Sequence, residues 1–189
     1  MKNLWWCIKD HIKHDVIDDI VNQCEKKELK NGTLGVTSGN VDVGIRSVNS
    51  CFLNKNEFAD LHTLVLDLAH DANKAAFGFD IASVQNIQYL QYDSKQQGKY
   101  DWHTDTFWVN PEIPLYQRKI SVVIQLSNPK EYKGGEFQID DPEWKDFSEF
   151  SKSKGSVILF PSFLLHRVTP VTEGTRRSLV AWIDGLNFR

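Results

Sequence analysis

Residues 156–184, SVILFPSFLLHRVTPVTEGTRRSLVAWID, contain the patterns that decide the fold. Short runs of β-branched, apolar and aromatic residues, mostly bounded by Gly, Pro, Asn or Asp, are typical of β-strands. Similar runs precede this stretch, and the predicted strands are Ser83–Tyr92, Ile120–Ser127, Gly135–Ile139, Ser156–Phe160, His166–Val168 and Ser178–Asp184. Half a dozen short strands favour an antiparallel barrel or jelly roll. The charged segment Asp140–Lys154 is expected to be a surface insertion, with a lid as one role for it.

Two helices are predicted before these strands, at Lys9–Lys27 and Phe58–Phe77, because apolar residues recur there at helical spacing. The second helix carries a wide apolar stripe of the kind that packs on a sheet. A Gly-rich break at 31–40 and a strand at Val43–Leu53 separate the two helices. The chain is therefore predicted to be an α+β fold with a mainly β core. Residues 1–189 would form one domain, with mainly helical support in 1–80 and the β core in 81–189.

Composition limits the classes of partner. Hydrophobic residues make up 41% of the 189 residues and charged residues 25%, which is ordinary for a globular protein. The net charge of -3 gives no basic surface for nucleic acid, and no apolar run is long enough to span a membrane. The N-terminus lacks the features of a secretory signal. Three scattered cysteines, Cys7, Cys24 and Cys51, fit a reducing compartment, so we expect a cytoplasmic location. The oligomeric state is not determined by these features.

A candidate metal site is formed by His103, Asp105 and His166. His103 and Asp105 flank Thr104, so on an extended segment their side chains project to the same side. His166 lies in a predicted strand that could run beside that segment. Two imidazoles and one carboxylate can bind one face of a metal ion and leave the other face open, as in non-haem Fe(II) oxygenases.

Other residues of the chain weigh on this interpretation. The remaining histidines, His11, His14, His62 and His70, lie on the predicted helices and are interpreted as solvated helix surface. Zinc is a competing metal, because two histidines and a carboxylate can hold it with a water as fourth ligand. Arg176, ten residues after His166, has a forked guanidinium suited to a carboxylate, for which a zinc hydrolase has no general need. The constellation favours iron.

Several short motifs also occur in one order from about Ala72 to the C-terminus. They are Gln88-x-x-x-Tyr92, Tyr100-x-x-His103-x-Asp105, Arg118-Lys119-Ile120-Ser121, Gly134-Gly135-Glu136-Phe137, Phe160-Pro161-Ser162, His166-Arg167-Val168-Thr169-Pro170-Val171 and Gly174-Thr175-Arg176. Together they resemble the prolyl 4-hydroxylase-related branch of the Fe(II)/2-oxoglutarate dioxygenases, most closely its PKHD-type hydroxylases. The resemblance implies a double-stranded β-helix, or jelly roll, flanked by the N-terminal helices.

The resemblance also implies the cofactors and their ligands. Fe(II) would be held by His103, Asp105 and His166, and the 5-carboxylate of 2-oxoglutarate by Arg176. Dioxygen would be the second co-substrate, and ascorbate (vitamin C) is a further candidate cofactor.

Four more residues are assigned to the co-substrate pocket. Tyr92 and Trp182 match an aromatic residue of the pocket and a tryptophan near the iron in related hydroxylases. Gln125 stands where several prolyl hydroxylases place a tyrosine or threonine hydroxyl against the 5-carboxylate. Ser178 alternates back to the side of Arg176, so it could contact the same carboxylate.

The resemblance implies hydroxylation of an unactivated C–H bond, most directly in a peptidyl residue such as proline, with release of succinate and CO2. Two segments, Thr106–Tyr116 and Asp140–Phe150, could shape an entrance for an extended peptide substrate. One alternative is an oxygenase acting on a small molecule or a nucleobase. The demethylases of alkylated bases usually carry two arginines six residues apart, whereas here Arg176 and Arg177 adjoin. The other alternative is a non-catalytic, metal-binding jelly-roll sensor.

Overall fold

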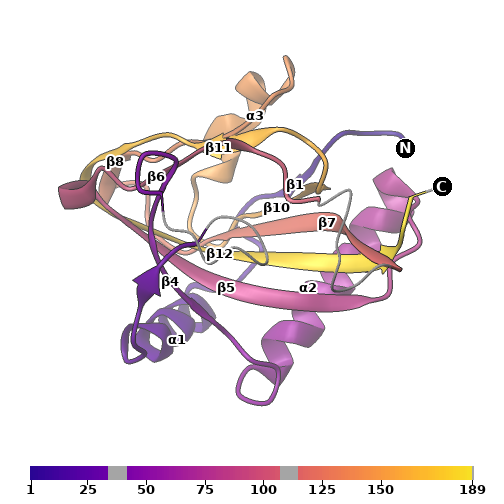
Figure 1. The fold of residues 1–189 in the computed structure, drawn as a ribbon, viewed down its shortest axis with the longest axis horizontal. Coiled ribbons are helices and arrows are strands. Elements are labelled where there is room, and N and C mark those ends of the chain that lie inside the picture. Colours follow the sequence, from indigo (N-terminus) through magenta and orange to yellow (C-terminus); the bar gives the residue numbers. More distant parts are fainter. Residues whose placement is uncertain (34–41, 107–114, 189) are drawn as a thin grey trace.

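The computed structural model describes residues 1–33, 42–106 and 115–188, and these form two antiparallel sheets that lie one over the other (Figure 1). The large sheet has eight strands among these residues. Seven follow the order β1 (Trp6–Ile8), β10 (Val157–Pro161), β7 (Tyr116–Gln125), β12 (Val171–Leu186), β5 (Ser83–Asp93), β4 (Asn49–Phe52) and β2 (Lys30–Asn31), and β8 (Tyr132–Gly134) pairs with β12. The small sheet has the order β3 (Arg46–Ser47), β6 (Lys99–His103), β11 (His166–Val168) and β9 (Phe137–Ile139).

Helices α1 (His14–Glu25) and α2 (Ala59–Ala72) lie on the face of the large sheet that points away from the small one (Figure 1). The apolar stripe of α2 packs on β5, β7 and β12, and a short π-helix (Asn73–Phe77) extends it. The predicted helix at Phe58–Phe77 therefore has the predicted partner. The first helix is shorter than predicted, because the chain enters it only after β1 has paired with β10.

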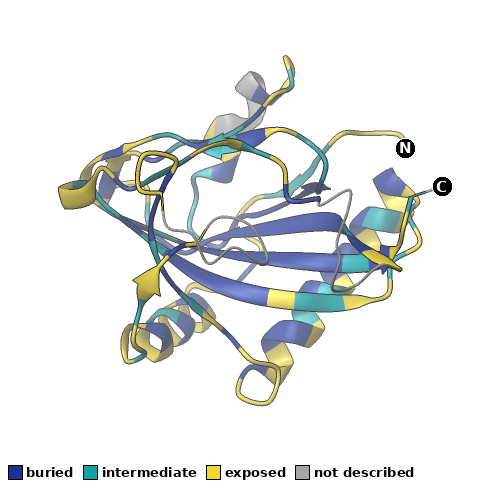
Figure 2. Ribbon diagram, viewed as in Figure 1, coloured by how far each residue is buried: buried dark blue, intermediate teal, exposed yellow. Residues whose placement is uncertain are grey.

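Two hydrophobic cores result from this layering, and both show as dark blue in Figure 2. One lies between the helices and the large sheet and includes Ile17, Val65 and Ile124. The other lies between the two sheets and includes Tyr92, Phe160 and Trp182. The α+β class with a mainly β core is confirmed. No helix in the described part of the chain is long and apolar enough to cross a membrane.

The predicted strand Val43–Leu53 is divided between the two sheets. Residues 43–45 form a turn, β3 pairs with β6 in the small sheet, and β4 pairs with β5 in the large one. One short segment thus connects the two layers at the edge of the space between them. Most of the Gly-rich break before it, 34–41, lies outside the described residues, as does 107–114 of the predicted entrance segment.

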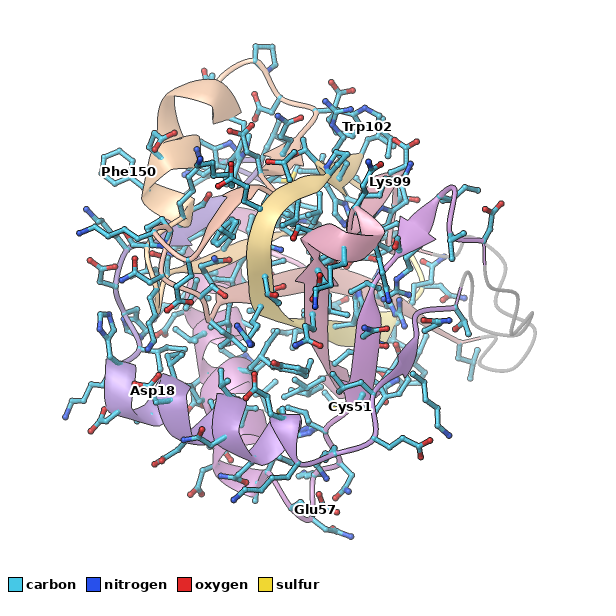
Figure 3. All side chains as sticks on the ribbon, turned by 90° about the vertical axis from the view of Figure 1, so that its left-hand side faces the viewer. Asp18, Cys51, Glu57, Lys99, Trp102 and Phe150 are labelled. Atoms are coloured by element: carbon cyan, nitrogen blue, oxygen red, sulfur yellow. The ribbon has the colours of Figure 1, made fainter. Side chains whose placement is uncertain are left out.

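The Asp140–Lys154 segment is anchored rather than simply laid on the surface, which corrects part of the expectation. It contains α3 (Trp144–Ser151), and Trp144 is only 2% exposed. The indole Nε1 of Trp144 donates to the Phe137 carbonyl, and the ring packs edge-on against Trp5. Phe150, by contrast, projects outward from this helix (Figure 3). The role of the segment as a lid stays a prediction.

Candidate active site

A pocket of about 100 Å³ lies between the two sheets. Its wall on the small sheet is made by Arg46, Tyr100, His103, His166, Phe137 and Val168, together with Asp105 just beyond β6. Its wall on the large sheet is made by Gln88, Leu90, Tyr92, Arg118, Val123, Arg176, Ser178, Leu179, Val180 and Trp182. The pocket therefore combines apolar side chains with a set of convergent polar and charged groups, which can orient a ligand.

His103, Asp105 and His166 come together in this pocket. His103 on β6 and His166 on β11 are paired directly in the sheet register, and Asp105 follows β6 by two residues. One ligand atom from each residue can be chosen so that all three lie within 4.8 Å of one another. His103 Nε2 lies 3.8 Å from Asp105 Oδ1, and His166 Nε2 lies 3.5 Å from Asp105 Oδ2. These separations are longer than usual N–H···O hydrogen bonds, so the three donors surround a common space rather than bind each other.

The hydrogen bonds of the two imidazoles leave both Nε2 atoms available to a metal. His103 Nδ1 lies 2.7 Å from the Asp101 carbonyl, and His166 Nδ1 lies 2.8 Å from the Leu164 carbonyl. A carbonyl only accepts, so Nδ1 carries the proton and Nε2 the lone pair. Burial, with the neighbouring His166, lowers the pKa of His103 to about 4. Neutral imidazoles with a fixed tautomer and a nearby carboxylate fit the donor set of Fe(II).

Asp105 is a buried carboxylate. Burial raises its pKa, but His166, His103 and Arg118 outweigh that effect and hold the pKa below its usual range. Ser121 Oγ also donates a hydrogen bond to Oδ2 at 2.7 Å. The carboxylate therefore stays ionised, as a metal ligand must.

The other histidines lie apart from this group. Within the described residues, His103, Asp105 and His166 are the only set of three His, Cys, Asp or Glu side chains close enough to share an ion. His11, His14 and His70 are exposed, as predicted. His62 corrects the prediction, because it is buried and its Nε2 lies 3.0 Å from the Leu53 carbonyl. The apolar face of α2 is wider than the sequence pattern indicated.

Arg176 lies on β12 opposite Tyr92 of β5 and is only 3% exposed. Its guanidinium carbon is 5.5 Å from the centre of the Tyr92 ring, and Nη1 donates to Ser178 Oγ at 3.3 Å. No carboxylate of the described residues forms an ion pair with it. A buried cation without a partner is costly, so this position suits an anionic ligand.

The Gly134-Gly135 turn contributes to this arrangement. Both glycines have positive φ, and Gly135 also borders the arginine. A Cβ at Gly135 would lie 3.0 Å from Arg176 Cδ and 2.8 Å from Val171 Cγ2. The absence of a side chain there leaves room for the stem of Arg176.

Three of the four further predicted pocket residues, Tyr92, Ser178 and Trp182, line the pocket. Gln125 does not. Its amide Nε2 donates to Tyr132 Oη at 2.9 Å and to the Ser127 carbonyl at 3.3 Å. The prediction that Gln125 faces the 5-carboxylate therefore lacks support from the geometry, because its amide donors are engaged by neighbours near β8.

Tyr100 both packs on a predicted metal ligand and faces the pocket. Its ring stacks on the His103 imidazole with centroids 3.5 Å apart, and it also lines the pocket. Arg177 faces the opposite side of β12, and its Nε donates to Glu25 of α1.

Two further arginines at the pocket were not assigned a site role from the sequence. Arg46 on β3 donates through Nη1 to the Thr33 carbonyl and through Nη2 to Gln88, and its guanidinium lies over the Tyr100 ring. Arg118 on β7 stacks over Trp182 at 3.8 Å. Arg118 belongs to a motif of the resemblance, but Arg46 reaches the pocket only because Val43–Leu53 changes sheets, which no local pattern indicates.

Comparisons with known proteins agree with this geometry. The sequence model of the 2OG-Fe(II) oxygenase superfamily matches residues 87–184. A PKHD-type hydroxylase of Crocosphaera subtropica is 34% identical over 103 residues, which cover 54% of this chain and 44% of that protein. A PKHD-type hydroxylase of Psychrobacter sp. is 40% identical over 89 residues, covering 46% and 34% of the two chains. The chain thus spans less than half the length of these curated relatives.

Solved structures share the fold along almost the whole chain. A viral collagen prolyl hydroxylase from Paramecium Bursaria Chlorella virus-1, in a 2OG complex, has a TM-score of 0.71 at 21% identity and covers 97% of each chain. A prolyl hydroxylase from Trichoplax adhaerens, in complex with a hypoxia inducible factor peptide fragment, has a TM-score of 0.70 at 19% identity, covering 96% and 83%. These likenesses confirm the expected jelly-roll fold.

Proposed function

The chain belongs to the 2OG-Fe(II) oxygenase superfamily, and we propose that it hydroxylates an unactivated C–H bond of a peptidyl residue, proline first. The reaction would consume 2-oxoglutarate and O2 and release succinate and CO2. One observation carries this proposal: the ligand atoms of His103, Asp105 and His166 converge in the same pocket as Arg176. Arg176 is buried and forms no ion pair with a carboxylate of the described residues. A cation for an acid and a site for a metal thus lie side by side.

His103, Asp105 and His166 would hold Fe(II), which when bound activates O2 for oxidation of the co-substrate and hydroxylation of the substrate. The protein's part is to keep these donors ready. The backbone carbonyls of Asp101 and Leu164 fix both imidazole tautomers. Because burial lowers the pKa of His103 to about 4, its Nε2 is unprotonated at neutral pH.

Arg176 would bind the 5-carboxylate of 2-oxoglutarate, because its fork matches a carboxylate and its position is buried. Ser178 Oγ already lies 3.3 Å from its Nη1, so the hydroxyl can hold the guanidinium or turn to the ligand. Apolar side chains at the pocket, among them Leu90, Val123 and Val180, would exclude water from the co-substrate. The site therefore binds, orients and shields.

A peptidyl substrate is supported by the relatives and by one exposed aromatic residue. The solved structures with this fold include a collagen prolyl hydroxylase and a prolyl hydroxylase bound to a peptide fragment. Phe52 on β4 lines the pocket yet is 60% exposed, so it offers an apolar contact to a chain lying outside. We place the protein in the cytoplasm, since Cys7, Cys24 and Cys51 are all free thiols.

The metal and co-substrate sites can be tested first without a substrate. Fe(II) and 2-oxoglutarate are added anaerobically to the metal-free protein, and the visible charge-transfer band expected for this family is recorded. The band should appear in the wild type, disappear in Arg176→Ala, and persist in the control Arg177→Ala, whose side chain faces Glu25 on the other side of β12. No band in the wild type, with zinc bound instead, would contradict the oxygenase assignment.

The substrate class is tested by turnover. Succinate release is measured with a library of proline-containing peptides and with matched peptides in which alanine replaces proline. Succinate formation coupled to a mass increase of one oxygen in the proline peptides alone is the expected result. Oxidation of a small molecule or nucleobase, with none of any peptide, would move the protein to another substrate class.

A further inference from the structure

Two buried serine hydroxyls lie in series beside Asp105. Ser121 Oγ donates to Asp105 Oδ2 at 2.7 Å, and Ser162 Oγ lies 2.9 Å from Ser121 Oγ. Each serine is 0% exposed. A hydroxyl can donate only one hydrogen bond. Because Ser121 donates its hydrogen bond to the carboxylate, it must accept a hydrogen bond from the Ser162 hydroxyl. The groups form a directed chain in which each hydrogen bond polarises the next toward the carboxylate.

Ser162 also fixes the main chain that carries Asp105. The backbone amides of Asp105 and Thr106 both donate to the Ser162 carbonyl, at 2.8 and 3.0 Å. The Ser162 amide in turn donates to the Lys119 carbonyl on β7. Ser162 therefore holds residue 105 twice, through its peptide group and through the hydroxyl of Ser121.

Ser121 lies in the middle of the large sheet, where it can hold a fixed position. On β7 it pairs with Phe160 of β10 on one side and with Trp182 of β12 on the other. The carboxylate of Asp105 is thereby tied from the small-sheet side of the pocket to the centre of the large sheet.

The two oxygens of the Asp105 carboxylate are not equivalent. Oδ2 accepts from Ser121, whereas Oδ1 accepts no hydrogen bond from the residues that the structure describes. We propose that Ser121 and Ser162 are positioning residues that hold Asp105 so that Oδ1 remains available to the metal. This inference rests on the proposed function, because it concerns the metal site that function requires.

A structural role alone would explain small side chains at these positions but not paired hydroxyls that end on a metal-site carboxylate. Ser156 provides the comparison within the same chain. It is also 0% exposed, but its Oγ serves the Phe150 carbonyl and the Asp10 amide, away from the pocket. Ser156→Ala is therefore a matched control for the loss of a buried hydroxyl.

The test measures how tightly the metal-free protein binds Co(II). Calorimetry and the cobalt absorption spectrum each report this affinity. Ser121→Ala should weaken Co(II) binding by roughly 10- to 100-fold, the range typical of groups that support a metal ligand. Ser162→Ala should cause a smaller loss. Ser121→Thr, which keeps the hydroxyl, should restore affinity to within a few-fold, and Ser156→Ala should bind like the wild type.

A double variant separates the proposed chain from two independent packing effects. Because Ser162 acts on the carboxylate through Ser121, Ser162→Ala should weaken binding little further in the Ser121→Ala background. Thermal unfolding of the metal-free variants reports the purely structural cost. We expect Ser121→Ala and Ser156→Ala to unfold at similarly lowered temperatures while only the former loses Co(II) affinity.

Wild-type affinity in Ser121→Ala, or losses that add in the double variant, would overturn the inference. If Ser121→Ala does not fold, Ser162→Ala decides in its place. Weaker Co(II) binding in Ser162→Ala than in Ser156→Ala supports the proposed series of hydroxyls, and equal binding overturns it. Asp105→Ala distinguishes this failure from that of the proposed function. If Asp105→Ala binds Co(II) like the wild type, the metal site itself is refuted. If Asp105→Ala loses Co(II) affinity but Ser121→Ala keeps it, only the positioning role of the serines is refuted.

Discussion

His103 and His166 lie directly opposite each other on the antiparallel strands β6 and β11, with ring centroids 4.2 Å apart. Each ring is oriented in the same way, by a hydrogen bond from Nδ1 to the carbonyl two residues earlier, Asp101 or Leu164. Local backbone thus fixes each tautomer, and the strand register brings the two Nε2 atoms together. A binding site for a metal is built into the pairing of the two strands.

This pairing predicts which histidines control metal content. His166→Ala and Asp105→Ala should each abolish stoichiometric Fe(II) binding and iron-dependent turnover, because each removes one of three donors within 4.8 Å. Metal content after anaerobic loading is the measurement. His70→Ala, on the exposed face of α2, serves as the control and should load fully. Loss of iron in His70→Ala would show that the wrong histidines were chosen.

Arg176→Ala should weaken 2-oxoglutarate binding by about 30-fold or more, since removing one partner of a buried charge pair costs about 2–5 kcal/mol. Arg176→Lys should recover part of this, because it keeps the charge but loses the fork. Titration of the Fe(II)-loaded protein with 2-oxoglutarate gives both values. Arg177→Ala, which removes the ion pair with Glu25 on the other side of β12, should bind like the wild type. Equal losses in both alanine variants would place the carboxylate elsewhere.

The sequence predicted the strands of the core well but not the contacts made between distant segments. From Ser83 onward, β-branched runs marked most strands, because a strand buried on both faces needs such residues. β1 was not predicted, since Trp6–Ile8 is short and becomes a strand only by pairing with β10. The division of Val43–Leu53 between two sheets was missed for the same reason.

The same limit applies to the candidate site. His103, Asp105 and Arg176 could be predicted as site residues from their spacing, because they lie on regular strands or next to them. Arg46 could not be assigned to the pocket, since its position depends on the change of sheet. The hydrogen bond from the Gln125 amide to Tyr132 could not be predicted either, because that contact is set by the pairing of β8 with β12.

The cysteines predict a dependence on pH. Burial raises the pKa of Cys7 to about 11 and of Cys24 to about 12, and it also raises the pKa of the Cys51 thiol. Thiolate is the reactive form, so alkylation of the native protein at pH 8 should be much slower than in urea, with Cys24 slowest. Mass spectrometry of iodoacetamide-treated protein across pH gives the rates.

The same shifts fix how stability depends on pH. An unfolded thiol has a pKa of about 8.5, so above this pH the unfolded chain releases protons that the folded chain retains. The free energy of unfolding should therefore fall as pH rises above about 8.5. Denaturation at pH 8 and pH 10 measures the change. A native protein alkylated at pH 8 as fast as the unfolded chain would contradict the burial of these thiols.

Gly135 links the fold to co-substrate binding, and it can be tested against a second glycine. Gly135→Ala places a Cβ 2.8 Å from Val171 and 3.0 Å from Arg176, at φ +60. Gly78→Ala has a similar φ of +72 but nothing within 4 Å of its Cβ. The left-handed conformation alone costs about 1–2 kcal/mol, so both variants should lose that much stability. Gly135→Ala should lose roughly 1–3 kcal/mol more, from overpacking.

Only Gly135→Ala should also bind 2-oxoglutarate more weakly, because its new methyl group displaces the stem of Arg176. Denaturant unfolding gives the two stabilities, and titration of the Fe(II)-loaded proteins gives the two affinities. Wild-type 2-oxoglutarate affinity in Gly135→Ala, with the stability loss of Gly78→Ala, would mean that Val171 and Arg176 yield to the methyl group. The glycine would then serve the turn alone, and the position of Arg176 would not depend on it.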